Sequence, residues 1–480
     1  MEEPKYISDF LVANAKNIPN QNFLICPDKT LTWQEVYDLS SIVAGFINNQ
    51  FGGQQQKIVS LILPDTWQFV VASLGVTISG NICLPIDMSF KKLEVDSVLE
   101  SAQPQMIIAC EETKHLAGDN FVLIEDILKS DRRLNKIEYD LPPKQQLSSL
   151  FLSSGTTGKP KSIPNTHANQ LWDVAAIAGP MGWTNDDTLL LTLHLSHRHG
   201  LIICLLSAIY HGSTVYLEER FNPARVLEFL ESGKISMFVS VPAAYEKLVE
   251  FEPDKKFDLS KVRLFASGSS ALPPYLFEDF KKRFGHNILD RYGTSETGSI
   301  AFKHDANSGI FDTVLEGVEL RVEPDGEVAL ISPGLFPGYL NNQEATTKSL
   351  TKDGWWLTGD IGETKNGKLI LKGRTKERIN KSGYSIYPQD IEWALKQNKK
   401  IREVKVISTP VEHHLDDKVF AFYAGDANGQ ELVEYSKLNL PRSWRPDEFI
   451  KINEIPRNAN GKYSLVKLHE LLNKDYKHLL

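Results

Sequence analysis

The sequence lacks the features that mark a disulfide-built, nucleic-acid-binding or membrane-spanning protein. Only four of its 480 residues are cysteines, none in a Cys-x-x-Cys pair, and this scarcity favours a reducing compartment. Positive charge is not in excess, because 53 basic and 61 acidic residues give a net charge of −8, so we expect no nucleic-acid partner. The apolar run at 201–210 is half as long as a membrane span, and the acidic start MEEPKY is unlike a signal peptide. We expect a soluble, cytoplasmic protein without membrane insertion.

What is present is an ordinary globular composition, 41% hydrophobic and 24% charged, over a length that implies two to four folding units. The pattern predicts a buried strand at Lys57–Leu63, then a helix with Asp65 as its N-cap, then a second apolar segment at Asn81–Ile86. Strand, helix and strand in succession predict parallel α/β layers.

Turn signals and apolar runs predict a different arrangement in the last third of the chain. The pairs Asp325-Gly326 and Asn366-Gly367 each lie between apolar runs and predict hairpin turns, so the region Gly317–Arg374 is expected to be mostly antiparallel β. Further strands are predicted at Val404–Ile407 and Val419–Tyr423.

The most informative segment is SSGTTGKPK at Ser153–Lys161, which precedes a predicted helix with Leu171, Val174, Ala175 and Ala178 on one face. Two glycines, four hydroxyls and two lysines supply the backbone N–H, O–H and ammonium donors that a phosphate needs. It is not a Walker loop, because Ser153 stands where the first glycine would be and Pro160 follows Lys159. A solvated linker is the alternative, although such linkers seldom end in Gly-Lys-Pro-Lys between two apolar elements.

This segment closely resembles the phosphate loop T-S-G-T-T-G-x-P-K-G of the adenylate-forming superfamily, which includes acyl-CoA synthetases, aryl-CoA ligases, luciferases and peptide adenylation domains. Further motifs follow in the family's order from about Asp87 to Lys462. The resemblance implies an α/β fold: a large multi-layer α/β N-terminal domain with an antiparallel β portion at 1–375, and a small mobile α+β C-terminal domain at 376–480. It also implies that ATP is bound by the loop residues Ser153, Ser154, Gly155, Thr156, Thr157, Gly158, Lys159 and Lys161.

Other motifs complete the implied nucleotide site. The triplet of Gly268, Ser269 and Ser270 resembles the turn that flanks the adenine, and RYGTSET at Arg291–Thr297 resembles Y-G-x-T-E. The latter implies that Tyr292, followed by Gly293, offers the purine an aromatic face, that Ser295 meets the α-phosphate, and that Glu296 holds Mg²⁺.

The segment WWLTGD, which ends at Asp360, and the pair Gly373-Arg374 resemble the motifs whose Asp and Arg contact the ribose. The resemblance therefore assigns Asp360 and Arg374 to the nucleotide site. Each of these short motifs alone is compatible with a plain turn, and it is their order that favours a nucleotide site.

The C-terminal motifs resemble the family's mobile domain. Lys376 occupies the hinge position, and Gly383, in RINKSG, corresponds to the loop beside the thiol tunnel. PRNANGK at Pro456–Lys462 resembles P-R-T-x-x-G-K, which makes Lys462 the candidate catalytic lysine. A solvated terminal lysine is the alternative.

A looser match concerns the acid pocket. HLSHRHG at His194–Gly200 resembles P-L-F-H-x-x-G and places His197, a catalytic candidate, at the family's gating histidine. Arg198 and His199 either line the acid pocket together with Arg291 or are surface residues at a helix start. If they line the pocket, their charge favours a small or polar acid, and H-x-H-G with R-Y-G resembles malonyl-CoA synthetases.

One residue departs from that last likeness: Asp312 stands where a glycine normally borders the pocket. The implied reaction is that of an ATP-dependent acid–thiol ligase, which forms an acyl-AMP with release of pyrophosphate and then transfers the acyl group to coenzyme A. Its partners are a small carboxylic acid, ATP, Mg²⁺ and coenzyme A. The alternatives are an acyl-AMP ligase that loads a phosphopantetheinyl carrier protein, and a non-catalytic nucleotide-binding module. The presence of Lys462, Glu296 and Asp360 counts against the last.

Overall fold

The computed structural model describes residues 5–134, 138–152, 161–252, 255–305, 308–381, 384–410, 416–457 and 463–479. The chain divides into two compact units. Unit 1 comprises Met1–Glu319 and Ile331–Ser349, and unit 2 comprises Leu320–Leu330 and Leu350–Leu480. The domain border expected between residues 375 and 376 stays a prediction.

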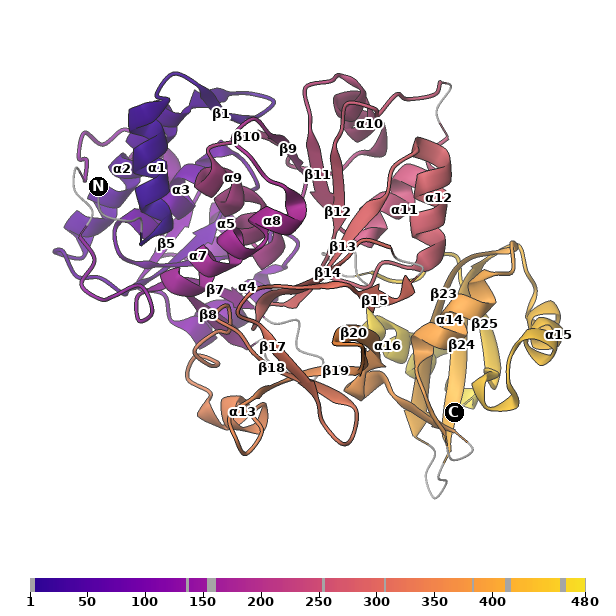
Figure 1. Cartoon of the computed structure of the whole chain (residues 1–480). Helices are drawn as coiled ribbons and strands as arrows, with labels where there is room; N and C mark the ends of the chain where they lie inside the picture. Colours follow the sequence, from indigo (N-terminus) through magenta and orange to yellow (C-terminus); the bar gives the residue numbers. More distant parts are fainter. Residues whose placement is uncertain are drawn as a thin grey trace. The chain divides into compact units, whose positions relative to one another are not determined.

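Unit 1 contains a nine-stranded sheet whose centre is parallel (Figure 1). Its order is β16 (Thr313–Val314), β14 (Gly298–Lys303), β13 (Ile288–Thr294), β12 (Leu264–Ser267), β11 (Met237–Ser240), β9 (Thr188–Leu191), β10 (Thr214–Leu217), β1 (Asn22–Ile25) and β2 (Thr30–Thr32). The strands from β13 to β1 pair in parallel, whereas β2, β14 and β16 add antiparallel edges.

A six-stranded sheet is the second layer of unit 1. Its order is β6 (Val122–Leu123), β5 (Met106–Ala109), β3 (Ile58–Ile62), β4 (Ile82–Pro85), β7 (Leu147–Leu152) and β8 (Ser162–Thr166). All its pairings are parallel except β7 with β8. Helix α3 (Trp67–Ile78) connects β3 to β4, which confirms the predicted strand, helix and strand.

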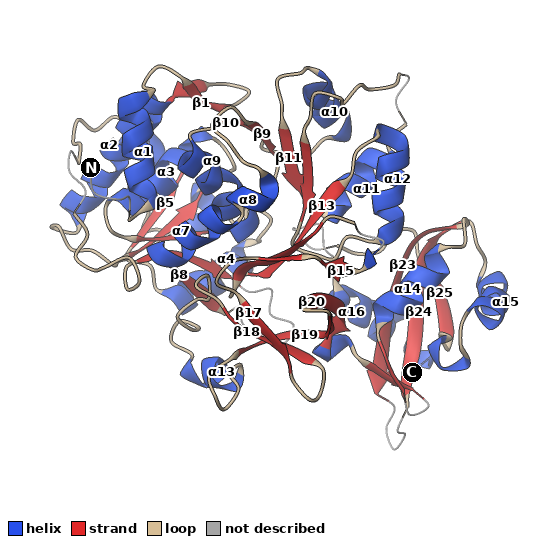
Figure 2. Ribbon diagram, in the orientation of Figure 1, coloured by secondary structure: helices blue, strands red, loops and turns tan. Residues whose placement is uncertain are grey.

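The main core lies between these two sheets, because one buried cluster joins Val59 and Ile108 of the smaller sheet to Leu189 and Val239 of the larger one. Several helices contribute to it: α1 (Ile7–Asn17), α2 (Trp33–Gln50), α3, α7 (His167–Ala176), the π-helix η1 (His199–Leu206) and α9 (Ser207–His211). A second cluster packs the other face of the nine-stranded sheet against α10 (Pro223–Glu231), α11 (Pro242–Glu250) and α12 (Pro274–Phe284) (Figure 2).

The remaining elements of unit 1 are short or peripheral. A third buried cluster packs α4 (Lys92–Ala102) and α5 (Lys114–Ala117) on the outer face of the six-stranded sheet. The others are α6 (Ile124–Ile127), α8 (Ala178–Met181), β15 (Ile310–Phe311) and α13 (Gln343–Lys348). Within the described residues, no helix is both long and apolar enough to cross a membrane, and all four cysteines are free and buried.

Unit 2 is largely antiparallel, as predicted for this region. The strands β17 (Glu319–Val322), β18 (Glu327–Ile331), β19 (Trp356–Lys365) and β20 (Lys368–Arg374) lie side by side in chain order. Gly326 has φ +88°, and Asn366 and Gly367 have φ +53° and +72°, the left-handed geometry of tight hairpin turns. Both predicted turns are therefore confirmed.

The C-terminal part of unit 2 is α+β. It begins with η3 (Thr375–Glu377) and the hairpin of β21 (Ile379–Lys381) and β22 (Tyr384–Ile386). A three-stranded sheet of β23 (Ile401–Pro410), β24 (Asp417–Gly425) and β25 (Glu448–Lys451) follows. Its helices are α14 (Pro388–Lys396), α15 (Gly429–Asn439), η4 (Arg442–Trp444), α16 (Leu465–Asp475) and η5 (Lys477–Leu479). The two strands predicted near the C-terminus are confirmed as β23 and β24, and the α/β fold class is confirmed for the chain as a whole.

Candidate active site

The segment that follows β9 lies against the carboxyl ends of two neighbouring parallel strands. Asp65 follows β3 and accepts hydrogen bonds from His194 Nδ1 at 2.8 Å and from the Leu195 N–H at 2.9 Å. Asp87 follows β4 and lies 2.8 Å from His197 Nε2. Ligands of open α/β sheets bind beyond the carboxyl ends of parallel strands, so these pairs occupy the place where a site is expected.

The predicted N-cap role of Asp65 is wrong. Helix α3 begins at Trp67, and its N-cap is Thr66, which makes no side-chain capping bond. The Asp65 carboxylate is instead used by the histidine segment, 129 residues further along the chain. A charge that is almost fully buried needs an ionic partner more than a helix end needs a cap.

The two aspartate–histidine pairs shift the pKa of one member each. The hydrogen bond with Asp65 raises the pKa of His194, against the effect of burial. Burial raises the pKa of Asp87, but the hydrogen bond and charge of His197 and the Ser89 N–H outweigh it, so this pKa lies below its usual range. The first pair therefore favours the protonated form of His194, and the second favours the ionised form of Asp87.

Arg198 and His199 are buried, with 6% of each residue exposed, which excludes the alternative of surface residues at a helix start. Arg198 is the last residue before η1 and forms an ion pair with Asp173, Nη2 to Oδ2 2.6 Å. Because its Nη1 also donates to the Asn165 side chain, the guanidinium binds protein groups on two sides.

Three of the predicted motifs meet at a buried arginine. A Cβ atom added to Gly268, just after β12, would lie 3.0 Å from Arg291 Nη2 and 3.2 Å from His199 Cε1, so these three residues are in close contact. Ser269 has φ +70° and places its Oγ 2.9 Å from His199 Nδ1. Arg291, on β13, donates from Nη1 to Ser299 Oγ at 3.0 Å. Burial lowers the pKa of Arg291, and the charge of Asp173 opposes that effect.

The predicted magnesium ligand is held by a tyrosine. Glu296 Oε1 accepts a hydrogen bond from the Tyr339 hydroxyl at 3.0 Å, and the Glu296 carbonyl accepts one from the Phe336 N–H at 2.8 Å. Lys161 Nζ lies 4.5 Å from the centre of the Tyr339 ring. A hard carboxylate oxygen supported by an outer hydrogen bond fits the way Mg²⁺ is bound beside substrate phosphates.

The aromatic candidate for the purine is Tyr292, which is buried and packs its ring 5.5 Å from that of Phe311, between centroids. Gly293 lies against the Gly298 carbonyl so closely that a Cβ would be 2.2 Å from that oxygen. Ser295 follows on the half-buried turn between β13 and β14.

The two ribose candidates are in unit 2 and face each other across a hairpin. Asp360 on β19 pairs with Arg374 at the end of β20, and Arg374 Nε donates to Asp360 Oδ1 at 3.1 Å. Asp360 is buried, whereas Arg374 is exposed. Lys376, the predicted hinge residue, follows in η3 and is exposed.

The other predicted site residues lie outside the described residues: Ser153, Ser154, Gly155, Thr156, Thr157, Gly158, Lys159, Gly383 and Lys462. Ser270 is exposed. Asp312, expected at the pocket border, is 2.7 Å from His304 Nδ1 through its Oδ1 and accepts the His304 N–H through Oδ2.

Sequence reasoning missed five residues that organise this site: Asp87, Asn165, Asp173, Ser299 and Tyr339. The prediction for α7 explains the most important omission. Val174 is buried in the core and Leu171 packs against it, as predicted, whereas Ala175 is exposed. The polar residues Asn169, Gln170 and Asp173 are buried on the same helix, which the apolar pattern does not show. An acidic residue next to Val174 in a helix that follows a phosphate loop was the available signal.

Known proteins resemble this chain along most of its length. The family model for the AMP-binding enzyme matches residues 11–340. The mitochondrial malonate–CoA ligase ACSF3 of Homo sapiens is 28% identical over 90% of this chain and 86% of its own length. The 2-succinylbenzoate–CoA ligase of Listeria monocytogenes is 27% identical over 97% of this chain and 99% of its own.

Solved structures show the same fold. ATP-bound MatB from Rhodopseudomonas palustris has a TM-score of 0.90 at 20% identity and covers 98% of this chain and 99% of its own. The o-succinylbenzoate coenzyme A synthetase MenE from Bacillus subtilis, in complex with ATP and magnesium ion, has a TM-score of 0.84 at 24% identity, covering 96% and 98%. The resemblance to adenylate-forming enzymes is confirmed. Because the family model spans well over half of the residues, the chain belongs to the AMP-binding enzyme family.

Proposed function

We propose that this protein activates a small carboxylic acid as its acyl-AMP, with ATP and Mg²⁺ and release of pyrophosphate, and then transfers the acyl group to coenzyme A. Membership of the family and the relatives named as CoA ligases support this reaction. The observation that carries it is the meeting of Gly268, Ser269, His199 and Arg291, from three separate motifs, in one buried cluster.

The charges of that cluster indicate the class of acid. Asp173 offsets the charge of Arg198, and Lys303 pairs with Asp290 at 3.0 Å. Arg291 donates to the neutral Ser299, and its buried Nε has no hydrogen-bond partner among the described residues. A buried cation with an unused N–H favours a substrate that carries a second anionic group. Two relatives are named for malonate and for 2-succinylbenzoate, both dicarboxylates.

The first step brings two anions together, so the protein must neutralise charge and align the reactants. Glu296, supported by Tyr339, would hold Mg²⁺, which neutralises phosphate charge when bound. Lys462 would lie between the acid and the α-phosphate, and the residues at 153–161 would hold the departing pyrophosphate. Asp360 and Arg374 would bind the ribose hydroxyls, and His197, oriented by Asp87, would border the acid.

ATP–pyrophosphate exchange with a panel of acids tests this function. We expect exchange with C3 and C4 dicarboxylates, little with a C16 acid, and AMP formation that depends on coenzyme A. The Arg291→Met variant is expected to raise KM for malonate about tenfold or more, and acetate, which lacks the second carboxylate, is the internal control. If AMP formation requires a phosphopantetheinyl carrier protein instead of coenzyme A, the acyl acceptor is that carrier protein. Absence of exchange with every acid would refute the proposal. The cytoplasmic location stays a prediction, since the relatives include a mitochondrial enzyme and bacterial enzymes.

A further inference from the structure

Helix α7 carries a fully buried carboxylate on its inner face. Asp173 has none of its side chain exposed, and Asn169, one turn earlier, is also buried. Helix α7 follows directly from β8, the strand that leaves the loop at 153–161. A charge in this position is stable only when ionic and hydrogen-bonding partners surround it, so its partners show what it holds in place.

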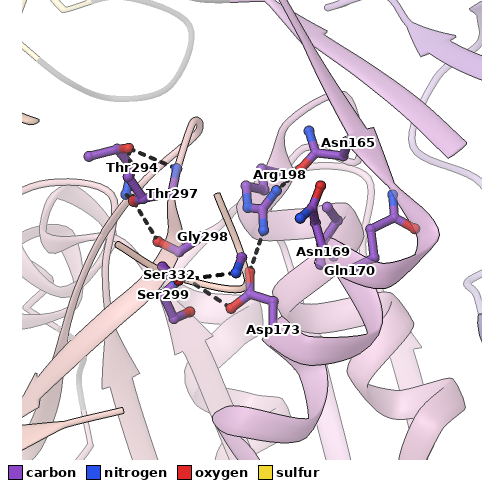
Figure 3. Close-up of polar contacts among 12 residues, drawn as sticks. Asn165, Asn169, Gln170, Asp173, Arg198, Thr294, Thr297, Gly298, Ser299 and Ser332 are labelled. Carbon is purple, nitrogen blue, oxygen red and sulfur yellow. Dashed lines mark hydrogen bonds and ion pairs between the residues drawn. The ribbon is translucent and has the colours of Figure 1, made fainter. Parts of the chain in front are cut away.

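The first partner of Asp173 is Arg198. The pair is made through Nη2 and Oδ2 at 2.6 Å, with 7% of the arginine side chain exposed. Figure 3 shows Arg198 between Asn165 and Asp173, and both make bonds to its guanidinium. Arg198 is therefore a counter-charge to α7, and its place in the lining of the acid pocket stays a prediction.

The second partner of Asp173 is the backbone that follows the motif RYGTSET. Asp173 Oδ1 accepts the Ser299 N–H at 3.0 Å (Figure 3). A Cβ at Gly298, which has φ +71°, would lie 2.8 Å from Arg198 Nη2 and 3.0 Å from Asp173 Oδ2, so the ion pair packs directly on this backbone. Ser299 Oγ in turn accepts the hydrogen bond from Arg291 Nη1. One chain of contacts thus runs from Asp173 through Ser299 to Arg291.

Asn169 makes a separate chain of contacts from the same helix. Its Nδ2 donates to the Pro333 and Leu335 carbonyls at 2.8 and 2.9 Å. The next residue, Phe336, donates its N–H to the Glu296 carbonyl. Asn169 therefore supports the loop that fixes the backbone of Glu296.

We propose that Asp173 is a positioning residue that sets Arg291 for the acid through Ser299, while Asn169 on the same helix sets Glu296 for the metal–nucleotide side. This inference rests on the proposed function for its kinetic effect. It assigns the acid side of the site to Asp173 and the metal–nucleotide side to Asn169. Because these residues lie one helical turn apart and use different contacts, the two sides are separable by mutation.

Kinetics with malonate, ATP and Mg²⁺ separate the two chains of contacts. Asp173→Asn is expected to raise KM for malonate about tenfold, since small misplacements of a substrate-positioning group are costly, and to leave KM for ATP within about twofold. Ser299→Ala, which deletes only the hydroxyl that Arg291 uses, is expected to give the same pattern and serves if Asp173→Asn does not fold. Asn169→Ala is the matched variant, and it is expected to raise the Mg²⁺ half-saturation while leaving KM for malonate within about twofold. Parallel changes in KM for malonate, KM for ATP and the Mg²⁺ half-saturation in all three variants indicate a general packing defect and overturn the inference.

Crystal structures of the variants test the inference without turnover. In Asp173→Asn, or in Ser299→Ala if the former does not fold, the Arg291 guanidinium is expected to leave its position beside residue 299. In Asn169→Ala it is expected to stay. An unmoved Arg291 in Asp173→Asn and Ser299→Ala overturns the inference even if an acid is activated. Conversely, a wild-type protein that activates no acid refutes the proposed function, and the structures still decide the role of Asp173.

Discussion

Replacing Tyr339 by phenylalanine is expected to weaken the use of Mg²⁺ while preserving the fold. The substitution removes the hydroxyl that donates to Glu296 Oε1 at 3.0 Å and keeps the ring that contacts Lys161. Burial and the nearby Glu296 charge raise the pKa of Tyr339, so the hydroxyl remains a donor at neutral and mildly alkaline pH. The Glu296 carboxylate then loses the bond that fixes its orientation.

The magnitude follows from the charge and burial of this bond. A hydrogen bond to a charged group contributes about 1.5–3 kcal/mol, and the half-buried position of Tyr339 argues for the lower end. About 1.4 kcal/mol corresponds to a tenfold change in an equilibrium constant. We therefore expect the Mg²⁺ concentration for half-maximal pyrophosphate exchange to rise about tenfold in Tyr339→Phe.

The chain offers a matched control for this experiment. Tyr275 also donates its hydroxyl to a buried glutamate, Glu246 Oε1, at 3.1 Å, but on helices α12 and α11 rather than beside the site. Tyr275→Phe is expected to lower stability to a similar extent and to leave the Mg²⁺ requirement unchanged. An equal Mg²⁺ shift in both variants, or no shift in Tyr339→Phe, would refute the assignment of Glu296 to the metal.

Two further predictions concern the acid side. Asp65→Asn is expected to lower stability by about 1 kcal/mol, a small value because the His194 side chain is 41% exposed. The pKa of His194 is raised in the folded state, so this stabilisation is complete below its unfolded pKa of about 6.5 and is lost as pH rises through the folded pKa. The difference in melting temperature between wild type and variant should therefore shrink from pH 6 to pH 9. A difference that grows over this range would contradict the prediction. Gly268→Ala is expected to lower kcat/KM for the acid about tenfold, because the new Cβ would lie 3.0 Å from Arg291 Nη2. Gly179→Ala, where nothing lies within 4 Å of the added Cβ, is the control, and equal losses in both variants would show that Arg291 is not involved.

Local patterns predicted the fold where one physical effect dominates. The strand β3 is almost wholly buried, so its continuous apolar run was sufficient, and the Asn366-Gly367 turn needs two positive φ angles that this pair tolerates best. These features depend on neighbours in sequence, which is why a single sequence reveals them.

The sequence is a poor guide where the contacts of a side chain depend on residues far away in the chain. Asp65 precedes a helix and has the side chain of an N-cap, but its partner is His194, which no local pattern indicates. On helix α7 the apolar pattern indicates the burial of Val174 but not that of Asp173, which is buried because Arg198 and Ser299 satisfy its charge. The motif residues of the candidate site come from the resemblance, whereas partners such as Ser299 and Tyr339 are revealed by the packing.

The most direct test of the central claim is ATP–pyrophosphate exchange measured with and without malonate, in the wild type and in Arg291→Met. We expect malonate-dependent, Mg²⁺-dependent exchange in the wild type, followed by formation of AMP and malonyl-CoA when coenzyme A is added. We also expect Arg291→Met to need about tenfold more malonate for the same rate. Exchange that is equally efficient with malonate in both proteins would contradict the role of the buried arginine. The absence of exchange with every acid tested would contradict the adenylation reaction itself.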